Sequence, residues 1–220
     1  ARDVGLVPAG EGEAADSYLF VMTRADEERM AADRSPLAAA RRAWLKKKLL
    51  ATCANQELGA ASDSEQRAAI ASQIDELAAV NPTPSPAASS LLRGKWEVVW
   101  TTESELLLLV NKGLPGLPGE GASQIIRFAE ADDDASQRPL ELLNCVQFEG
   151  GSALTVTSTC VPSSGERVRF RFSSCAACLY GLEFPLPPVG SGFFDVVYID
   201  ADLRLCKDVR GDLQICKRVG

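Results

Sequence analysis

Apolar residues follow a helical period from about Pro36 onward. Leu45, Leu49 and Cys53 recur every four residues, a spacing that places them on one face of an α-helix. Ser35 is a favoured N-cap residue, and Pro36 suits the first helical position because its missing amide would be unpaired there in any case. The pattern therefore predicts a helix that begins at Pro36.

A second helical pattern comes next, with Ile70, Ile74 and Leu77 on one stripe. Ser62 and Glu65 precede this stripe at the spacing of a capping box, in which the two side chains pair with free amides of the first turn. We therefore expect Ser62 to cap a second helix.

The stretch from residue 81 to residue 90 separates two different patterns. It reads Asn-Pro-Thr-Pro-Ser-Pro-Ala-Ala-Ser-Ser, and its prolines lack amide donors and bias the residues before them towards extended backbone. The residues before position 36 are rich in alanine and charged side chains and have no long period. We therefore expect an extended N-terminal arm over residues 1–35, two helices and a proline-rich linker over residues 36–90, and a β-domain over residues 91–220.

Beyond the linker, apolar residues alternate with a period of two. The alternation is clear at Trp96, Val98 and Trp100, and over Arg167–Phe172 it separates an aromatic face from a cationic one. Strands are predicted at residues 95–101, 123–128, 140–148, 154–160, 167–172, 193–199, 203–206 and 213–217. About eight strands can close a small barrel whose interior holds side chains or one ligand. The predicted fold class is α+β, mainly β, with N-terminal helices followed by an antiparallel β-barrel.

Two stretches rich in proline, Gly113–Gly119 and Phe184–Pro188, interrupt the strand pattern. Proline removes a hydrogen bond from a β-ladder, so both stretches are expected to be loops. Leucine and phenylalanine exposed on such loops would suit insertion into a lipid surface or a lid over a cavity. Packing over one end of the barrel is an equally open alternative.

Composition and charge narrow the class of protein. The 220 residues are 46% hydrophobic and 24% charged, which is enough apolar material for a core. A net charge of -7 argues against nucleic-acid binding, since phosphate contacts need a surplus of lysine and arginine. The longest apolar stretches, Tyr18–Met22 and Leu106–Val110, fall far short of the ~20 residues of a membrane-spanning helix. We expect a soluble or peripheral protein, and the start at Ala1 without a charged-then-apolar leader indicates a processed or artificially shortened chain.

The sequence offers little chemistry for catalysis. It contains no histidine, which removes Ser-His and Cys-His nucleophile pairs and the commonest general base near neutral pH. The seven cysteines are an odd number in a chain large enough to fold without disulfides, which indicates a reducing compartment. Cys175-Ala-Ala-Cys178 has the spacing of a redox or zinc motif; we interpret it as two ordinary thiols beside a loop, with a redox-sensitive disulfide as the alternative. We predict no catalytic residue, no metal site and no enzyme activity.

Cations cluster on the first predicted helix. Five of them lie within eight residues: Arg41, Arg42, Lys46, Lys47 and Lys48. On an acidic protein such a cluster could contact anionic lipid headgroups at a membrane surface, or an acidic protein partner. We predict a membrane or partner contact here, and a solvated helix face is the competing interpretation.

Two sequence motifs stand far apart in the β-domain. The first, after the proline-rich stretch, reads Leu91-Leu-Arg-Gly94-Lys-Trp96-Glu-Val-Val-Trp100-Thr-Thr102. The second reads Gly192-Phe-Phe-Asp195-Val-Val-Tyr198-Ile-Asp200-Ala-Asp-Leu203-Arg204-Leu-Cys and is followed by Gly211-Asp-Leu-Gln-Ile-Cys. In their order and separation they resemble the plastid lipid-associated protein family, also called fibrillins, over residues 36–218. The chain departs from the family pattern at Trp100, where tyrosine is commoner, at Cys206 and Cys216, and around Cys175–Cys178.

The resemblance implies a lipocalin-like barrel in a plastid such as the chloroplast, on thylakoids or plastoglobules or in the stroma. Members of this family are implicated in carrying or storing prenylquinones, carotenoids or fatty acids, so the implied ligand is one of these lipids, with no other cofactor. Gly94-x-Trp96 also resembles the first-strand motif of lipocalins, where the tryptophan closes one barrel end against an arginine from a late strand. Arg204 is the arginine that this resemblance implies for Trp96.

The leading hypothesis is a non-catalytic protein that binds a hydrophobic small molecule in the barrel, or a lipid surface at thylakoids or plastoglobules. Asp195 or Arg204 would then anchor a quinone or carboxylate head. The alternative is a structural subunit that docks onto a photosynthetic membrane-protein complex through its arm and its basic helix. The predicted ligand-binding residues are Trp96, Trp100, Phe170, Phe172, Phe194, Asp195, Tyr198 and Arg204.

Overall fold

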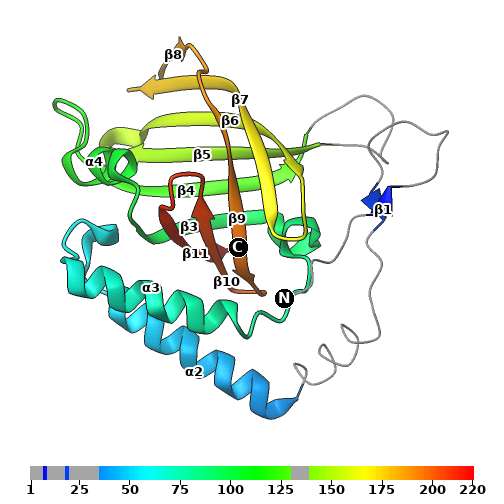
Figure 1. The fold of residues 1–220 in the computed structure, drawn as a ribbon. Helices are drawn as coiled ribbons and strands as arrows, with labels where there is room; N and C mark the ends of the chain where they lie inside the picture. Colours follow the sequence, from blue (N-terminus) through cyan, green and yellow to red (C-terminus); the bar gives the residue numbers. More distant parts are fainter. Residues whose placement is uncertain (1–6, 9–17, 20–34, 130–138) are drawn as a thin grey trace.

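A computed structural model describes residues 7–8, 18–19, 35–129 and 139–220 of the chain (Figure 1). The first two ranges are short strands, β1 (Val7–Pro8) and β2 (Tyr18–Leu19), which pair with each other in the antiparallel sense. Most of the predicted N-terminal arm therefore lies outside the described residues.

Two helices precede the main sheet. The first, α2 (Pro36–Cys53), begins where predicted, and the Ser35 hydroxyl accepts a hydrogen bond from the amide of Ala38 at 3.1 Å. Its buried side chains are the three that the four-residue spacing places on one face.

The second helix, α3 (Ser64–Ala78), has a different cap from the predicted one. Asp63 accepts a hydrogen bond from the amide of Gln66 at 2.8 Å, and the Gln66 side chain accepts one from the amide of Asp63 at 2.9 Å. The prediction of Ser62 as the cap is therefore wrong by one residue. The Ser62 hydroxyl instead accepts the indole N–H of Trp100 at 3.1 Å, which ties the start of the helix to the barrel.

The C-terminal part forms a nine-stranded antiparallel sheet in the order β6-β5-β4-β3-β11-β10-β9-β7-β8. An additional pairing between β6 and β7 closes every strand except β8 into a barrel (Figure 1). The strands are β3 (Gly94–Thr101), β4 (Gly119–Phe128), β5 (Leu140–Phe148), β6 (Ser152–Pro162), β7 (Arg167–Leu179), β8 (Leu182–Leu186), β9 (Ser191–Ile199), β10 (Leu203–Asp208) and β11 (Leu213–Val219). The predicted fold class, α+β and mainly β with helices ahead of a barrel, is confirmed.

One helix of the barrel, α4 (Ser104–Lys112), has no counterpart in the predicted pattern. Its Val110 is buried, and Leu106 and Leu109 pack partly against the barrel interior, so that α4 lies across one end of the barrel (Figure 1). In the described residues, short 3-10 helices occupy three connections: η1 (Glu57–Gly59) between α2 and α3, η2 (Pro86–Ala88) and η3 (Ser90–Leu92) between α3 and β3, and η5 (Glu149–Gly151) between β5 and β6.

The two predicted loops have different outcomes. Gly113–Gly119 holds only an isolated bridge between Leu114 and Leu117 before β4 begins at its last residue. Phe184–Pro188 was expected to be a loop, and this is wrong for its first part, which belongs to β8. Pro185 is tolerated because β8 is an edge strand that pairs with β7 alone.

Apolar side chains form one core inside the barrel and a second between the barrel and the helices. The inner core contains the fully buried Trp96, Phe148 and Val168. The outer core joins Leu49 of α2 and Leu77 of α3 to outward-facing side chains of β3, β9, β10 and β11. The two helices lie side by side along this face of the barrel (Figure 1).

A β-bulge in β3 decides which of its side chains face inward. The pairing with β11 steps from Trp100 opposite Ile215 to Val98 opposite Cys216, and Val99 has no partner between them. An unpaired residue reverses the facing of the residues beyond it, because side chains alternate along a strand. Val98 therefore belongs to the inner core and Trp100 to the outer core, although the two lie two residues apart.

A second bulge does the same in β9. The pairing with β10 steps from Tyr198 opposite Leu205 to Val196 opposite Cys206, with Val197 between them. Val196 lies in the inner core, whereas Tyr198 faces the helices. Both bulges thus send a large aromatic side chain out of the barrel and into the helix contact.

Candidate ligand-binding cavity

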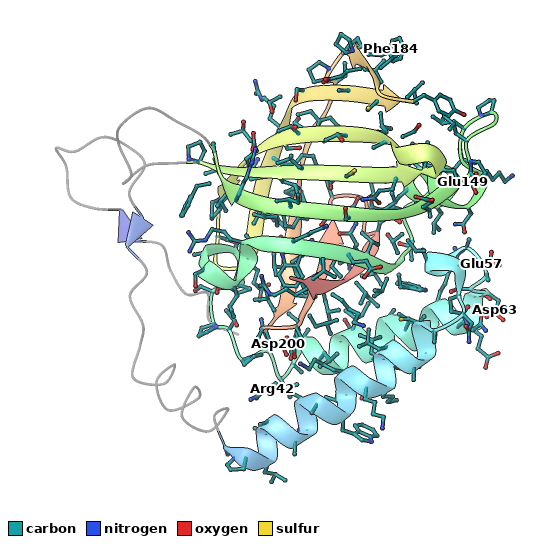
Figure 2. All side chains as sticks on the ribbon, turned by 180° about the vertical axis from the view of Figure 1, so that it is seen from behind. Arg42, Glu57, Asp63, Glu149, Phe184 and Asp200 are labelled. Carbon is teal, nitrogen blue, oxygen red and sulfur yellow. The ribbon has the colours of Figure 1, made fainter. Side chains whose placement is uncertain are left out.

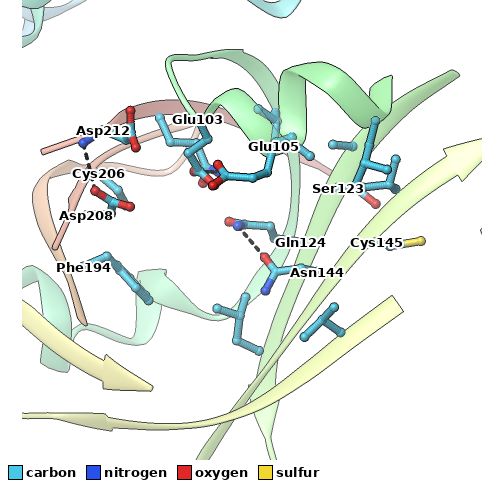
Figure 3. Close-up of a pocket in the computed structure, with 18 of the residues that line it drawn as sticks. Glu103, Glu105, Ser123, Gln124, Asn144, Cys145, Phe194, Cys206, Asp208 and Asp212 are labelled. Carbon is cyan, nitrogen blue, oxygen red and sulfur yellow. Dashed lines mark hydrogen bonds between the residues drawn. The ribbon is translucent and has the colours of Figure 1, made fainter. Parts of the chain in front are cut away.

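The barrel encloses a cavity of about 320 Å³ (Figure 3). Every strand of the closed barrel contributes to its lining, and so does α4. Its apolar walls include Val98, Leu142, Val146, Leu154, Phe170 and Phe194. A cavity of this size, with apolar walls and few polar groups, is typical of a small-molecule site.

Three phenylalanines stand in contact along one side of the cavity. The rings of Phe170 and Phe172 stack with their centroids 5.6 Å apart, and the centroids of Phe170 and Phe194 are 6.3 Å apart. Gly190 lets the chain pass close to them, because a Cβ there would lie 2.6 Å from the Phe172 ring. The alternating segment Arg167–Phe172 thus turns its aromatic side towards the cavity, as its pattern predicts.

Trp96 closes the barrel at the end where β3 begins, opposite the end covered by α4. The guanidinium carbon of Arg204 lies 5.0 Å from the centroid of the Trp96 ring, and that of Arg218 lies 4.1 Å from it. The contact with Arg204 is the one that the lipocalin resemblance implies. No sequence pattern indicated Arg218, which donates to the carbonyl oxygens of Ala201 at 2.7 Å and Arg93 at 2.8 Å.

Arg204 is a buried charge with an incomplete set of partners. The residue is 1% exposed and lines the cavity. Its Nη2 donates to Gln124 Oε1 and lies 3.4 Å from Cys216 Sγ. Its Nε and Nη1 have no hydrogen-bond partner, and no carboxylate in the described part of the chain forms an ion pair with it. Burying a charge without a partner is costly, so this arrangement is unusual for a purely structural arginine.

Further polar groups lie on the inner side of the barrel. Gln124 Nε2 donates to Asn144 Oδ1 at 2.7 Å, so Gln124 links Arg204 to Asn144 (Figure 3). Ser158 is fully buried, and its Oγ has no hydrogen-bond partner. Ser158 stands opposite the cavity residue Leu142, and because cross-strand partners share a face, its hydroxyl points inward.

Acidic residues gather at the solvent-facing end of the cavity, at the start of α4 and on the turn between β10 and β11 (Figure 3). They are Glu103, Glu105, Asp208 and Asp212. Arg210 lies among them: its Nη1 is 2.6 Å from Glu105 Oε1, and its Nε is 3.5 Å and 3.3 Å from carboxylate oxygens of Asp208 and Asp212. With four carboxylates around one guanidinium, this end of the cavity is acidic.

Glu103 is a partly buried member of this acidic group. Burial, together with the charges of Asp208 and Asp212, raises its pKa to about 7. Its Oε1 accepts a hydrogen bond from Gln214 Nε2 at 2.9 Å. No sequence pattern singled out Glu103, because the acidic group is assembled from α4 and a distant turn.

Four of the predicted ligand contacts lie outside the cavity lining, and one of them is Trp96, which belongs to the inner core at the closed end. Trp100 and Tyr198 belong to the outer core, since the two bulges turn them towards the helices. The Asp195 carboxylate forms an ion pair with Arg167. The Nε and Nη2 atoms of Arg167 donate to the two carboxylate oxygens at 2.7 Å and 2.8 Å. Of the two anchors proposed for a ligand head, Arg204 is therefore the one that the structure brings to the cavity.

The end of the second motif attaches α2 to the barrel. The Tyr198 hydroxyl donates to Asp200 Oδ2 at 2.7 Å, and Lys46 Nζ donates to the same oxygen at 2.7 Å. Lys46 also lies 2.9 Å from Asp202 Oδ2. Burial alone would raise the pKa of Asp200, but the hydrogen bonds from Lys46 and Tyr198 lower it overall. This part of the motif is thus structural in the described chain.

The five cations of α2 have different surroundings. Lys46 is engaged in the ion pair with Asp200, and Lys48 Nζ lies 3.6 Å from a carboxylate oxygen of α3. Arg42 is partly buried, whereas Arg41 and Lys47 are exposed. The cationic surface that a membrane or partner would meet is smaller than the sequence cluster suggests.

The thiols at Cys175 and Cys178 lie within β7, and Cys178 stands one residue before the end of the strand, beside the turn to β8. Side chains three residues apart on a strand point to opposite faces, and their Cα atoms are ~10 Å apart, too far for a disulfide. Both thiols are free, so the alternative of a disulfide between them does not fit the strand. Among the described residues, no three histidine, cysteine or acidic side chains lie close enough to hold a metal ion. None of the described helices is long and apolar enough to cross a membrane.

Comparisons with known proteins agree on one family. The family model PAP_fibrillin matches residues 43–217. Probable plastid-lipid-associated protein 11, chloroplastic, of Arabidopsis thaliana is 33% identical over 175 residues, which are 79% of this chain and 78% of that protein. The chromoplast-specific carotenoid-associated protein of Cucumis sativus is 33% identical over 52% of this chain and 33% of its own length. Plastoglobulin-1, chloroplastic, of Pisum sativum is 42% identical over 37% of this chain and 24% of its own length. No solved structure matches the chain.

Proposed function

The chain belongs to the plastid lipid-associated protein family, the fibrillins, and on this basis we propose that its barrel binds one apolar small molecule without catalysing a reaction. The chain is a plastid protein, as its chloroplast and chromoplast relatives are. The observation that carries the proposal is the cavity of about 320 Å³ with apolar walls. A prenylquinone, a carotenoid or a fatty acid has the apolar body that such walls accept.

The side chains of the cavity support a role without catalysis. Burial raises the pKa of the cavity thiol Cys206 to about 12, so this thiol stays protonated near neutral pH. The chain has no histidine that could activate a hydroxyl or a thiol. The cavity is thus better suited to holding a molecule than to transforming it.

Ligand uptake tests this proposal. The delipidated full chain should take up a fluorescent polyene fatty acid or a prenylquinone with near-stoichiometric occupancy, measured by fluorescence titration. Ala122→Leu should reduce the amount of ligand bound per chain, because the larger side chain adds volume at a buried position of the cavity wall. Ala40→Leu, at an exposed position of α2, is the matched control. Absence of uptake by the unmodified chain would contradict the proposal.

The hairpin of β7 and β8 supports a peripheral contact with a lipid surface. Large apolar side chains are exposed along it and on the loop after it: Tyr180, Leu182, Phe184, Leu186 and Val189. Glu183 is the one charged residue between positions 179 and 191. Figure 2 shows Phe184 at the far end of the molecule from α2 and α3. A protruding apolar hairpin of this kind can insert into a lipid surface while the barrel stays in water.

A second candidate function is docking onto a photosynthetic membrane-protein complex. One observation favours it: Leu37 and Trp44 of α2 are 81% and 60% exposed, and they share a helix face with Arg41. An exposed tryptophan beside a cation is common where proteins meet. Co-purification with such a complex that survives salt washing, and that Trp44→Ala and removal of residues 1–35 each weaken, would support this candidate. Unchanged co-purification in both variants would count against it.

A further inference from the structure

We propose that the cavity selects a ligand with a carboxylate head, which pairs with Arg204 while the apolar tail of the ligand points towards α4. This rests on the proposed function, since it names the chemistry of the molecule that the barrel binds. It assigns to Arg204 a task beyond the contact with Trp96.

The first argument is the unfinished coordination of Arg204. Its Nε and Nη1 are buried and lack hydrogen-bond partners, and only Nη2 has acceptors, Gln124 Oε1 and the weakly accepting Cys216 Sγ. A carboxylate binds a guanidinium through two adjacent N–H groups, and each adjacent pair on Arg204 joins Nη2 to one of the unpartnered nitrogens. A ligand carboxylate would therefore supply both the missing acceptor and the missing counter-charge.

The second argument is a hydroxyl on the same interior. Ser158 Oγ is fully buried and has no partner. Ser158 and Cys160 face the same way, because they stand two residues apart on β6. Ser158 stands opposite Leu142 of β5, and Leu142 and Arg204 line the same cavity. An oxygen-rich head at Arg204 would thus have a hydroxyl donor within the same interior.

The third argument is the distribution of charge along the cavity. The outer end carries Glu103, Glu105, Asp208 and Asp212 around one guanidinium, whereas the inner end carries Arg204 without a carboxylate. A carboxylate is repelled at the outer end and attracted at the inner end, and low-dielectric walls strengthen both effects. A neutral prenylquinone would gain little from this polarity, so the cavity discriminates by charge.

Apolar side chains line the cavity away from Arg204. Phe194 and Phe170 lie in contact, and the stacked Phe172 extends them along β7. Leu106 and Leu109 of α4 line the cavity at the other end. A straight hydrocarbon chain attached to the carboxylate would bury its length against these side chains.

The experiment compares ligands that differ only in the head. An 18-carbon fatty acid, its methyl ester and a neutral prenylquinone are titrated separately into the delipidated full chain below their aggregation limits. We expect the fatty acid to bind at least about tenfold more tightly than the ester, the difference that one charge-assisted hydrogen bond supplies. Arg204→Gln should remove this preference by lowering the affinity for the fatty acid to about that for the ester.

Arg167→Gln is the matched control, because it removes a guanidinium that pairs with Asp195 outside the cavity. It should leave the preference for the fatty acid intact. Circular dichroism and thermal unfolding establish that each variant folds. Should Arg204→Gln not fold, the preference of the unmodified chain remains measurable, and Ser158→Ala should lower the affinity for the fatty acid more than the affinity for the ester.

The outcomes separate this inference from the function on which it rests. Equal affinity of the unmodified chain for acid, ester and quinone would overturn the carboxylate head and leave the binding function standing. Failure of all three ligands to bind would overturn the binding function itself. A preference for the fatty acid that survives Arg204→Gln in a folded variant would show that the head pairs elsewhere and would overturn the role of Arg204.

Discussion

Gly94 shows how a single residue takes part in closing the barrel. Its φ is +137°, a backbone conformation that residues with a side chain rarely adopt. A Cβ at this position would lie 2.1 Å from Arg218 Nη1, in the guanidinium that packs on Trp96. The glycine of Gly94-x-Trp96 is therefore required both by the local backbone and by the arginine beside it.

Gly94→Ala should lower the free energy of unfolding by about 2 to 4 kcal/mol, because backbone strain and displacement of Arg218 both contribute. Urea unfolding measures this loss. Gly116→Ala is the matched control: φ is +75° there and no atom lies within 4 Å of the added Cβ. It should lose about 1 kcal/mol, from strain alone. Equal losses in the two variants would contradict a role for Arg218.

Glu103 makes the stability depend on pH near neutrality. Its pKa is about 7 in the folded chain against 4.5 for the free group, so the folded state holds the proton more tightly than the unfolded state does. The resulting stabilisation is fully present below about pH 4.5 and is lost as the pH rises through about 7.

We predict that the unmodified chain loses up to about 3 kcal/mol of stability between about pH 5 and about pH 8, and that Glu103→Gln does not. Glutamine keeps an oxygen for the hydrogen bond from Gln214. Urea midpoints across this pH range provide the measurement. Glu105→Gln is the control, since the hydrogen bond from Arg210 holds the pKa of Glu105 at about 2, outside the range. If the stability of Glu103→Gln fell with pH as steeply as that of the unmodified chain, Glu103 would not be the source of the pH dependence.

At the scale of helices and strands, the sequence predicts which elements exist better than it predicts which side chains of a strand point into the barrel. Alternation identifies every strand of the closed barrel, because each has one face on an apolar core. It does not reveal a bulge, which depends on the register between strands distant in the chain. Trp100 and Tyr198 were therefore assigned to the cavity, and both lie against the helices.

The same limit applies to the candidate site. The phenylalanines and Arg204 were predicted because strand alternation and a resemblance each marked them. The acidic end was not, because Glu103 and Asp208 come together only when β10 returns past the start of α4. β8 escaped prediction because prolines are read as breakers, although an edge strand accepts them.

The contact between α2 and the barrel depends on Asp200. Its Oδ2 accepts from Tyr198 and Lys46, and its Oδ1 accepts from the backbone amides of Asp202 and Leu203 at 2.8 Å. One carboxylate thus holds a helix, a strand and a turn together. Its removal would leave several donors without an acceptor.

Asp200→Ala should lower the free energy of unfolding by about 3 kcal/mol, because it leaves partly buried donors unpaired. Asp202→Ala is the control. Both carboxylates pair with Lys46, but the side chain of Asp200 is 17% exposed and that of Asp202 is 77% exposed. The control should lose under about 1 kcal/mol, as exposed ion pairs do. Similar losses in urea unfolding would argue that Asp200 is not the attachment point.

At the scale of the whole molecule, the two ends differ in character. The helices cover one side of the barrel, and the apolar hairpin of β7 and β8 protrudes at the far end (Figure 2). β8 is outside the closed ring of strands. The hairpin can therefore be altered without opening the barrel, which makes it a separable part of the molecule.

Leu182→Glu combined with Phe184→Glu should reduce flotation with neutral plastid-type lipid vesicles several-fold, because two charges on the hairpin oppose its insertion. Thermal stability should stay within about 0.5 kcal/mol of the unmodified chain, since both side chains are exposed. Val209→Glu, an exposed apolar position between β10 and β11, is the control and should float as before. Unchanged flotation of the double variant would exclude the hairpin as the lipid contact.

The pairing of β6 with β7 also bears on how the protein behaves when concentrated. Unpaired strand edges recruit further strands and seed aggregates. In the nine-stranded sheet β8 alone pairs with a single neighbour, and Pro185 in that strand offers no amide to an incoming chain. The exposed apolar hairpin is thus poorly suited to building an intermolecular sheet. On a crowded lipid surface we therefore expect the protein molecules to bind lipid through this hairpin without forming sheets with one another.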